Sequence, residues 1–458
     1  MGRRDVRHGS RLALWLPVVL VLAVLAAATT VLLLDDSPAE PETPAAVPPP
    51  PGLDLPEVVA PAPVAAPAAG TPDAAKVRRA LAGLIDDADL GPHVLATVAG
   101  LDGTVLYSSG TGAAVPASTL KLLTGAAALE TLGPDHTFAT KVVADGPRRV
   151  VLVGGGDPLL SAEDLAKLAR ATAAEVTGAV RVGYDTSLFS GPDVSPHWPA
   201  SYVTEGVVSP IQALWVDEGR DADGYGRVAD PARAAAEQFA AALAKAGVRV
   251  SGAPEEWSAP GGTALAEVSS EPLSRIVEHT LEYSDNEAAE VLARHVGLAS
   301  SGRGSFDAGA RGVLETIEAL GVPLATARVY DGSGLSRDNR LEPATLTALL
   351  EVAGSAEHPD LRAVLTGLPV AAFTGSLSER FDGAEDPGRG LVRAKTGTLT
   401  GVSGLAGTVT DRSGSPMVFA LLADRIALLD TLDARDALDD IAGALADCRC
   451  GGAGTVAP

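Results

Sequence analysis

Residues 118–132 read STLKLLTGAAALETL, an apolar run that predicts a buried helix with Ser118 and Lys121 in its first turn. Positions i and i+3 lie on the same face of a helix, so the Lys121 ammonium can lie beside the Ser118 hydroxyl. A serine attacks a carbonyl carbon only when a neighbouring group takes its proton. Lysine can take that proton when burial lowers its pKa, whereas arginine stays charged. This stretch is therefore a candidate for a helix that presents a nucleophilic serine.

Two shorter strings far along the chain offer groups that would complement this pair. Ser284-Asp-Asn286 lies between two helical patterns, where a turn would bring a hydroxyl and an amide into one space. Lys395-Thr-Gly-Thr398 lies inside a β-rich run, and its cation and hydroxyls suit a carboxylate. Gly397 removes a side chain where another backbone needs to approach closely.

Each string also has an ordinary structural interpretation. Ser118 could cap a helix, and Ser284–Asn286 could be a capped turn between helices. Lys395 could keep an exposed edge strand from aggregating. The chain has six Lys, two Asn and 28 Ser. At such frequencies the ordered trio arises by chance about once in a few thousand chains, so we favour a catalytic interpretation of the three strings together.

The composition limits the other possibilities. With 458 residues, 46% of them apolar, the chain is long enough for two or three domains and is not disordered throughout. A formal charge of −23 argues against nucleic acid as a partner, because nucleic acid needs a basic surface. Two cysteines exclude a disulfide-rich small fold and a Cys-rich zinc site. The seven His show no ligand spacing, so neither a metal nor a cofactor is expected.

The amino terminus predicts export. A basic stub at residues 1–11 precedes 23 uncharged residues at 12–34, which are long enough to span a bilayer with the amino end in the cytoplasm. The alternative is a signal peptide cleaved near Ala26–Ala28. In both cases the rest of the chain lies outside the cytoplasm. The Pro/Ala-rich segment 35–72 predicts either a semi-rigid spacer or an inert disordered tail.

The exported part alternates helical and β-rich patterns. It predicts an α+β domain at 73–139 and 263–450, interrupted by an inserted accessory domain at 140–262 and followed by a tail at 451–458. Cys448-Arg-Cys450 leaves open a local disulfide or two free thiols. Helical patterns cover 74–90, 118–132, 162–176, 232–246, 273–283, 287–296, 308–320, 343–352 and 429–446, and strand patterns cover 93–110, 391–399, 404–410 and 416–423.

The trio resembles the signature of the penicillin-recognising serine enzymes, the penicillin-binding proteins and serine β-lactamases. Ser284 follows Ser118 by 166 positions, which is much too long a gap for class A β-lactamases. The gap is similar to that of low-molecular-mass class C penicillin-binding proteins, the D-alanyl-D-alanine carboxypeptidase/endopeptidase type of peptidase family S13. The resemblance covers about residues 75 to 447, with a shorter insertion than in the best-known members. Three further strings fit that family: LVGGGDP at 152–158, YDGSGLS at 330–336 and FTGSL at 373–377.

This resemblance implies a transpeptidase-like fold, an antiparallel sheet flanked by helices, and a covalent mechanism. Ser118 would attack the carbonyl between the two terminal D-alanines of a peptidoglycan stem peptide, with Lys121 as base. Ser284 and Lys395 would complete the proton network. Backbone N–H groups of Ser118 and Thr398 would form the oxyanion hole. The implied substrate-binding residues are Asn286 for a peptide amide and Thr396, Gly397 and Thr398, with Lys395, for the terminal carboxylate.

The expected protein is thus a membrane-anchored serine D-Ala-D-Ala carboxypeptidase of the cell-wall space, with endopeptidase activity as a further option. Its expected partners are stem peptides ending in D-Ala-D-Ala, β-lactams as inhibitors and the membrane, but no nucleic acid. A β-lactamase or esterase on the same fold is one alternative, although the chain offers no clear extra base for a deacylating water. A non-catalytic β-lactam-binding or wall-binding protein is the other, and the intact trio argues against it.

Overall fold

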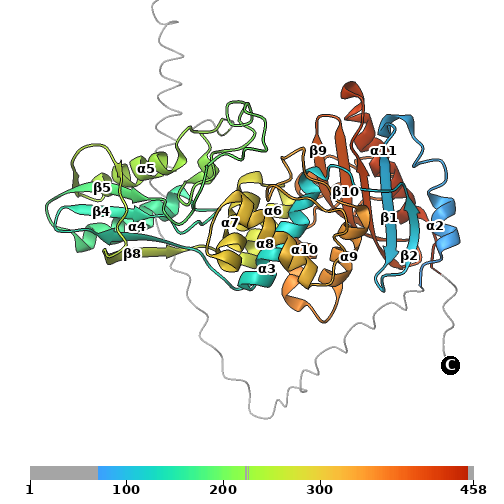
Figure 1. The fold of residues 1–458 in the computed structure, drawn as a ribbon, viewed down its shortest axis with the longest axis horizontal. Helices are drawn as coiled ribbons and strands as arrows, with labels where there is room; N and C mark the ends of the chain where they lie inside the picture. The colour runs from blue at the N-terminus through green and yellow to red at the C-terminus, as the bar shows by residue number, and fades with distance from the viewer. Residues whose placement is uncertain (1–70, 222–223, 225, 452–458) are drawn as a thin grey trace, which may run out of the picture. The chain divides into compact units, whose positions relative to one another are not determined.

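The computed structural model describes residues 71–221, 224 and 226–451, drawn in colour in Figure 1. The predicted stub at 1–11 and apolar segment at 12–34 lie outside the described residues. So do nearly all of the predicted spacer and of the predicted tail. Within the described part of the chain, no helix is both long and apolar enough to cross a membrane.

A five-stranded antiparallel sheet forms the frame of the fold, in the order β2-β1-β11-β10-β9. β11 pairs with β1 and β10, and β9 lies at one edge. A short turn around Asp102–Gly103 joins β1 to β2, within the strand pattern predicted at 93–110. The strands are β1 (Val94–Gly100), β2 (Val105–Ser109), β9 (Val392–Leu399), β10 (Val402–Thr410) and β11 (Pro416–Ala423).

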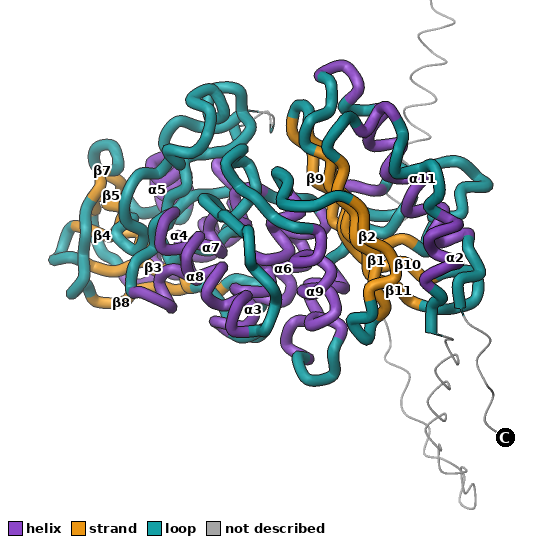
Figure 2. The backbone as a smooth tube through the Cα atoms, turned by 45° about the vertical axis from the view of Figure 1, so that its right-hand side comes forward, coloured by secondary structure: helices purple, strands orange, loops and turns teal. Residues whose placement is uncertain are grey.

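Helices cover both faces of this sheet, because β11 is apolar on both. Val418, Ala420 and Leu422 pack in one core with α9 (Pro343–Gly354). Residues of the opposite phase, such as Phe419, pack in a second core with α11 (Asp433–Asp447). Figures 1 and 2 show α11 beside the strands, on the same side as the first helix, α2 (Ala74–Ala80). The prediction of an α+β fold with a helix-flanked antiparallel sheet is confirmed.

The helix that follows Ser118 packs against α9 and is surrounded by a cluster of further helices. This helix, α3 (Lys121–Leu132), is buried without interruption from Lys121 to Leu129, as its apolar sequence predicts. A 3₁₀ turn, η3 (Ala117–Leu120), precedes it and holds Ser118. The other helices of the cluster are α6 (Leu273–Glu282), α7 (Asn286–Ser301), α8 (Phe306–Ala319) and α10 (Arg362–Thr366).

A second, mixed sheet has six strands, in the order β6-β5-β4-β3-β8, with β7 beside β5. β4, β5 and β6 are parallel, and the helices α4 (Ala162–Glu175) and α5 (Pro231–Lys245) make the crossovers that parallel strands need. The strands are β3 (Ala139–Ala144), β4 (Arg149–Val153), β5 (Ala179–Asp185), β6 (Arg249–Val250), β7 (Glu255–Glu256) and β8 (Thr263–Ser269).

β8 bears on the predicted boundary of the insertion. It lies beyond residue 262 but pairs antiparallel with β3, so it closes the second sheet. We therefore propose that the accessory segment runs from Ala139 to Ser269 rather than from 140 to 262. The sequence pattern did not indicate β8, because its burial is weak along its whole length.

Three helices are clearly shorter than their sequence patterns predict. The one predicted at 118–132 begins as the 3₁₀ turn η3 and is α-helical only from Lys121. The helix predicted at 74–90 ends at Ala80, ahead of Gly83 with a φ of +84°. The last helix begins at Asp433 rather than at 429, after a separate 3₁₀ turn. The short 3₁₀ elements are η2 (Ala88–Leu90), η3, η4 (Asp217–Gly219), η5 (Pro359–Leu361), η6 (Gly375–Leu377) and η7 (Leu428–Asp430).

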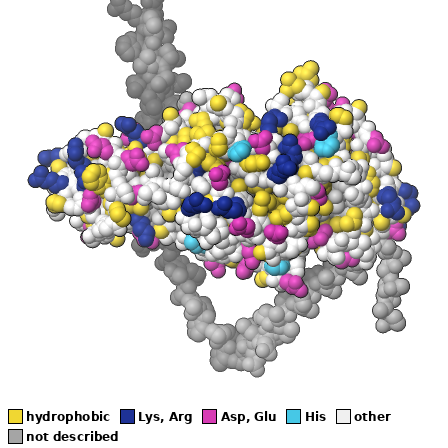
Figure 3. Space-filling view, viewed as in Figure 1, with side chains coloured by type: hydrophobic (Ala, Val, Ile, Leu, Met, Phe, Trp, Pro, Cys, Tyr) yellow, Lys and Arg dark blue, Asp and Glu magenta, His cyan; other side chains and the backbone are white. Residues whose placement is uncertain are grey.

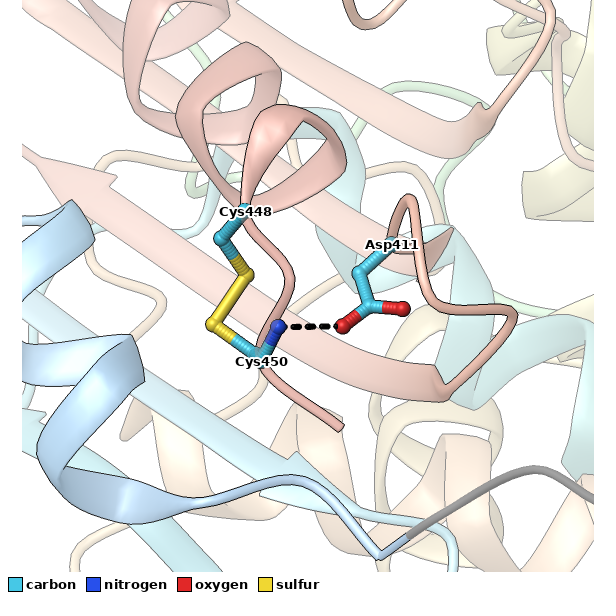
Figure 4. A group of neighbouring side chains, drawn as sticks. All are labelled: Asp411, Cys448 and Cys450. Atoms are coloured by element: carbon cyan, nitrogen blue, oxygen red, sulfur yellow. Dashed lines mark hydrogen bonds between the residues drawn. A yellow bond between two sulfur atoms is a disulfide. The ribbon is translucent and has the colours of Figure 1, made fainter. Parts of the chain in front are cut away.

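The carboxyl-terminal cysteines, whose state the sequence left open, form a disulfide between Cys448 and Cys450 (Figure 4). The Asp411 carboxylate beside them accepts the N–H of Cys450 at 2.7 Å and that of Gly451 at 3.0 Å. It also accepts the N–H of Ser415, so its oxygens serve as a local cap for the end of the described chain. On the face drawn in Figure 3, acidic and basic side chains of the described residues are interspersed.

Candidate active site

Ser118 and Lys121 meet as the helical spacing predicts. Lys121 is fully buried, and its Nζ donates to three oxygens at 2.8 Å each: Ser118 Oγ, Asn286 Oδ1 and the Ser333 carbonyl. Burial lowers the pKa of Lys121 to about 8, although the nearby Glu290 carboxyl acts in the opposite direction. Pro116 is the residue that caps η3, so the simple capping interpretation of Ser118 is wrong.

The turn at 331–334, which contains Gly334, packs against the backbone that carries Ser118. Ala117 has a φ of +46°, which is uncommon for a residue with a side chain. Gly334, with a φ of +87°, lies against it so closely that a Cβ there would be 1.9 Å from the Ala117 carbonyl. The turn at 331–334 therefore sets the position of Ser118 as well as offering the Ser333 carbonyl to Lys121.

Two buried carboxyl groups build that turn. Glu290 of α7 accepts the N–H groups of Gly332 and Ser333 at 2.9 and 2.7 Å. Asp331 accepts the Trp198 indole N–H at 2.8 Å and the Asn339 amide at 2.7 Å. Burial, with the charge of Asp331, raises the pKa of Glu290 to about 8. Glu290 and Trp198 are not indicated by the sequence, because neither belongs to a string with a distinctive spacing.

The Ser284–Asn286 string is both a helix cap and part of the site. Asp285 caps α7 by accepting the Ala288 N–H at 2.9 Å, so the structural interpretation holds for this residue. Asn286 nevertheless reaches Lys121 with its Oδ1 and donates from its amide nitrogen to the Val207 carbonyl at 3.3 Å. The string thus links the helix cluster to the accessory segment.

Ser284 directly precedes the cap residue Asp285 and has a strained backbone, with a φ of +58°. The predicted proton network includes its hydroxyl, yet the structure gives that hydroxyl no hydrogen bond within the described residues. Of the predicted site residues, Lys121 hydrogen-bonds directly to Ser118 and Asn286, and its third hydrogen bond goes to the Ser333 carbonyl.

Lys395 is fully buried on β9, which excludes the interpretation of an exposed edge lysine. Its Nζ donates to the Thr396 carbonyl at 2.9 Å. Burial lowers the pKa of Lys395 well below its usual range, and the charges of Lys121 and Arg380 add to the effect. Two buried lysines that influence each other's protonation therefore lie in one site. The Thr396 hydroxyl is 2.7 Å from the Ser376 hydroxyl, from the string at 373–377.

β9 runs against the turn that carries Ser118. A Cβ at Gly397 would lie 2.7 Å from the Pro116 carbonyl, so the close approach expected at this glycine is present. The Ala394 N–H donates to Pro369, away from β10, and N–H groups alternate along a strand. The Thr398 N–H therefore points to the same open edge of the sheet, and the Thr398 side chain is exposed.

This arrangement matches a known family over nearly all of the described chain. The model of the D-Ala-D-Ala carboxypeptidase 3 (S13) family matches residues 77–222 and 222–447. The chain belongs to this family. The predicted resemblance to S13 enzymes is thereby confirmed, and so is the prediction of a serine-type D-Ala-D-Ala carboxypeptidase.

Relatives of this S13 family member span similar lengths. Carboxypeptidase Rv3627c of Mycobacterium tuberculosis is 37% identical over 408 residues, which cover 83% of this chain and 86% of the relative. Carboxypeptidase DacB of Mycolicibacterium smegmatis is 37% identical over 433 residues, which cover 87% of this chain and 92% of the relative. Among solved structures, penicillin binding protein 4 (dacB) of Haemophilus influenzae aligns with a TM-score of 0.68 at 21% identity, covering 81% of this chain and 97% of its own. That likeness shows the same fold.

Proposed function

We propose that Ser118 is the nucleophile of this carboxypeptidase and that Lys121 is its general base. The observation that carries the proposal is the 2.8 Å contact between Lys121 Nζ and Ser118 Oγ, made by a fully buried lysine whose pKa is lowered to about 8. Once Lys121 has lost one proton, its two remaining N–H groups suffice for Asn286 and Ser333. Its free electron pair then faces Ser118 Oγ and can accept the hydroxyl proton.

The reaction divides into two steps. Ser118 Oγ attacks the carbonyl carbon of the penultimate D-alanine while its proton passes to Lys121. The N–H groups of Ser118 and Thr398 stabilise the oxyanion, since the first turn of a helix and the open edge of β9 leave such donors unpaired. The proton then passes to the leaving D-alanine amine, with Ser284 as relay. Water hydrolyses the acyl-enzyme and releases the shortened peptide.

The terminal carboxylate of the substrate supplies the anion that Lys395 lacks. Lys395 is buried without a carboxylate partner among the described residues, and Thr396 and Thr398 follow it on the same strand. Carboxylate binding would raise the pKa of Lys395 towards its usual range and orient the scissile bond. Asn286 would hold the adjacent peptide amide. Cleavage of cross-links, an endopeptidase activity, uses the same groups and belongs to the proposal.

We also propose that the enzyme lies outside the cytoplasm, anchored by residues 12–34. It is supported by the 23 uncharged residues after a basic stub. Membrane fractions of cells that make the full chain should retain it after a high-salt wash, and detergent should release it. Recovery in the culture medium as a shorter chain would indicate a cleaved signal peptide instead.

Covalent labelling tests the nucleophile. The purified full chain is mixed with a fluorescent penicillin beside Ser118→Ala and a control, Ser301→Ala, which alters a serine at the far end of α7. We expect a stable label on the parent and the control, none on Ser118→Ala, and release of D-alanine from a pentapeptide by the same two proteins. A transient label with consumption of penicillin would favour a β-lactamase. A folded parent that takes no label would indicate a non-catalytic binding protein.

A further inference from the structure

Three potential metal ligands converge beside the Ser284–Asn286 string, outside the group around Lys121. They are Glu218 of η4, His279 of α6 and Asp285, the cap of α7. One ligand atom from each lies within 4.8 Å of the other two. The sequence did not indicate this cluster, because its members come from three separate segments that meet only in the folded chain.

One carboxylate oxygen of Asp285 has no hydrogen-bond partner among the described residues. Its side chain is 3% exposed, and its Oδ1 accepts the Ala288 N–H. Its Oδ2 is buried and accepts no hydrogen bond from the described residues. A buried carboxylate oxygen in this state costs free energy unless a cation approaches it. This oxygen faces the His279 imidazole and is available as a metal ligand.

The distances suit a metal better than direct hydrogen bonds. His279 Nε2 is 3.5 Å from Asp285 Oδ2 and 3.9 Å from Glu218 Oε1, both longer than a good N–H···O contact. Two ligands that are each about 2.1 Å from a tetrahedral ion lie about 3.4 Å apart. The cluster is thus close to the spacing of a three-ligand site, and small side-chain shifts would complete it.

The surroundings supply what such a site needs. Arg220 donates from its Nε to Glu218 Oε2 at 2.9 Å, which fixes this carboxylate and leaves Oε1 for the ion. The His279 side chain is 34% exposed and borders a cleft of about 490 Å³ with Glu282 and Tyr283. Water can therefore reach the fourth position, and an ion can enter.

The charges of the cluster attract a cation. The nearby carboxylates of Asp285 and then Glu218 raise the pKa of His279 to about 9, so in the absence of metal a proton occupies the imidazole. Besides these two carboxyls, the nearby charged groups are Arg220 and the buried Glu287, which is held by Arg227. The cleft beside His279 is also lined by Glu271, Arg275, Glu278 and Glu282. A divalent ion would replace that proton and bind the neutral imidazole.

We propose that Glu218, His279 and Asp285 bind one Zn²⁺ ion, which ties the accessory segment to the loop of Ser284 and Asn286. Histidine with two carboxylates is a donor set that suits zinc. The ion would restrain Asp285 between two residues of the active site, without touching the substrate. Zinc binding is measured directly, so the outcome does not depend on the proposed chemistry at Ser118.

Calorimetric titration of the metal-free full chain with ZnCl₂ tests the proposal. We expect one ion per chain and release of about one proton at neutral pH, seen as a difference in heat between buffers of unequal ionisation enthalpy. Affinity should also fall as the pH is lowered, because protons compete with the ion for the imidazole and the carboxylates. Zinc should also raise the melting temperature of the parent.

Two isosteric variants and one control sharpen the test. His279→Gln and Asp285→Asn should bind zinc at least about tenfold more weakly, and Asn keeps the cap of α7. Glu282→Gln, which removes a carboxyl from the same cleft but not from the cluster, should bind as the parent does. Absence of binding to the parent, or equal binding by His279→Gln, would overturn the proposal. If the parent binds no zinc, His279 is instead a protonated link between the two carboxylates.

Discussion

Lys121 and Lys395 are two of only six lysines in the chain, and both side chains are completely buried. Arginine supplies the positive charge elsewhere, with 29 residues. Burial of a lysine costs free energy in its charged form, so both pKa values fall. A residue that can lose its proton near neutral pH is useful in catalysis, and arginine cannot replace it.

The pH dependence of acylation should follow Lys121. Its folded-state pKa is about 8, and only the neutral form can accept the Ser118 proton. The second-order rate constant for acylation by a fluorescent penicillin should therefore rise with pH, by up to about tenfold per unit, and level off above about pH 8. Stopped-flow labelling at several pH values measures it. A rate that falls over this range would remove Lys121 from the role of base.

Lys121→Arg should be almost as damaging as loss of the side chain, although the charge is kept. Arginine remains protonated and cannot accept the Ser118 proton, so acylation should slow by about 10²–10⁴-fold. The same labelling assay measures the loss. Lys167→Arg, on the exposed surface of α4, is the control and should keep the parent rate. A near-normal rate in Lys121→Arg would contradict the proposed role.

At the scale of elements, the site depends on how closely β9 and η3 approach. Contacts between the two are possible because Gly397 has no side chain towards Pro116. The sequence indicated a close approach at this glycine but not its partner. The partner is a 3₁₀ turn, whose backbone is held in turn by Gly334 from a third segment.

Gly397→Ala should separate β9 from η3. The added Cβ would lie 2.7 Å from the Pro116 carbonyl and 3.2 Å from the Thr119 nitrogen, so backbone must move. A displacement of about 1 Å can cost on the order of 100-fold in rate, and we expect acylation to slow by about 10–100-fold. Gly261→Ala is the matched control, because no atom lies within 4 Å of its Cβ position. Equal rates in the two variants would show that the close approach does not position the site.

At the scale of the whole molecule, the accessory segment is joined to α7 by buried polar contacts. Arg227 donates from its Nε to Glu287 Oε1 at 2.6 Å, and both side chains are less than a tenth exposed. The same oxygen accepts the Ser209 N–H at 3.0 Å. Glu287 directly follows Asn286, so these contacts bear on the active site as well as on the packing of the two parts.

Arg227→Ala should therefore destabilise the fold strongly. It leaves the buried Glu287 carboxyl without its cation, a change that typically costs about 3–5 kcal/mol. Urea unfolding followed by circular dichroism measures the free energy of unfolding. Arg233→Ala is the control, because its pair with Glu237 is more than half exposed and should contribute at most about 1 kcal/mol. A loss in Arg227→Ala no larger than in the control would contradict this account.

Much of the architecture follows from the sequence by itself. Local patterns indicate the helix after Ser118, the strands β10 and β11 and the helices α6 to α9. Burial on one face gives apolar residues at regular spacing, and burial on all faces gives a continuous apolar run. The three strings that we propose to be catalytic are also local. Spacing within a turn of helix or along a strand decides which side chains share a face, and this is enough to predict the pair Ser118 and Lys121.

Tertiary structure alone decided the rest. Glu290, Trp198 and the Val207 carbonyl join the site from separate segments, and β8 enters the second sheet by pairing with a strand far away in sequence. The cluster of Glu218, His279 and Asp285 arises in the same way. A buried polar atom takes whichever partner the packed chain brings within about 3 Å, and no local pattern records that choice.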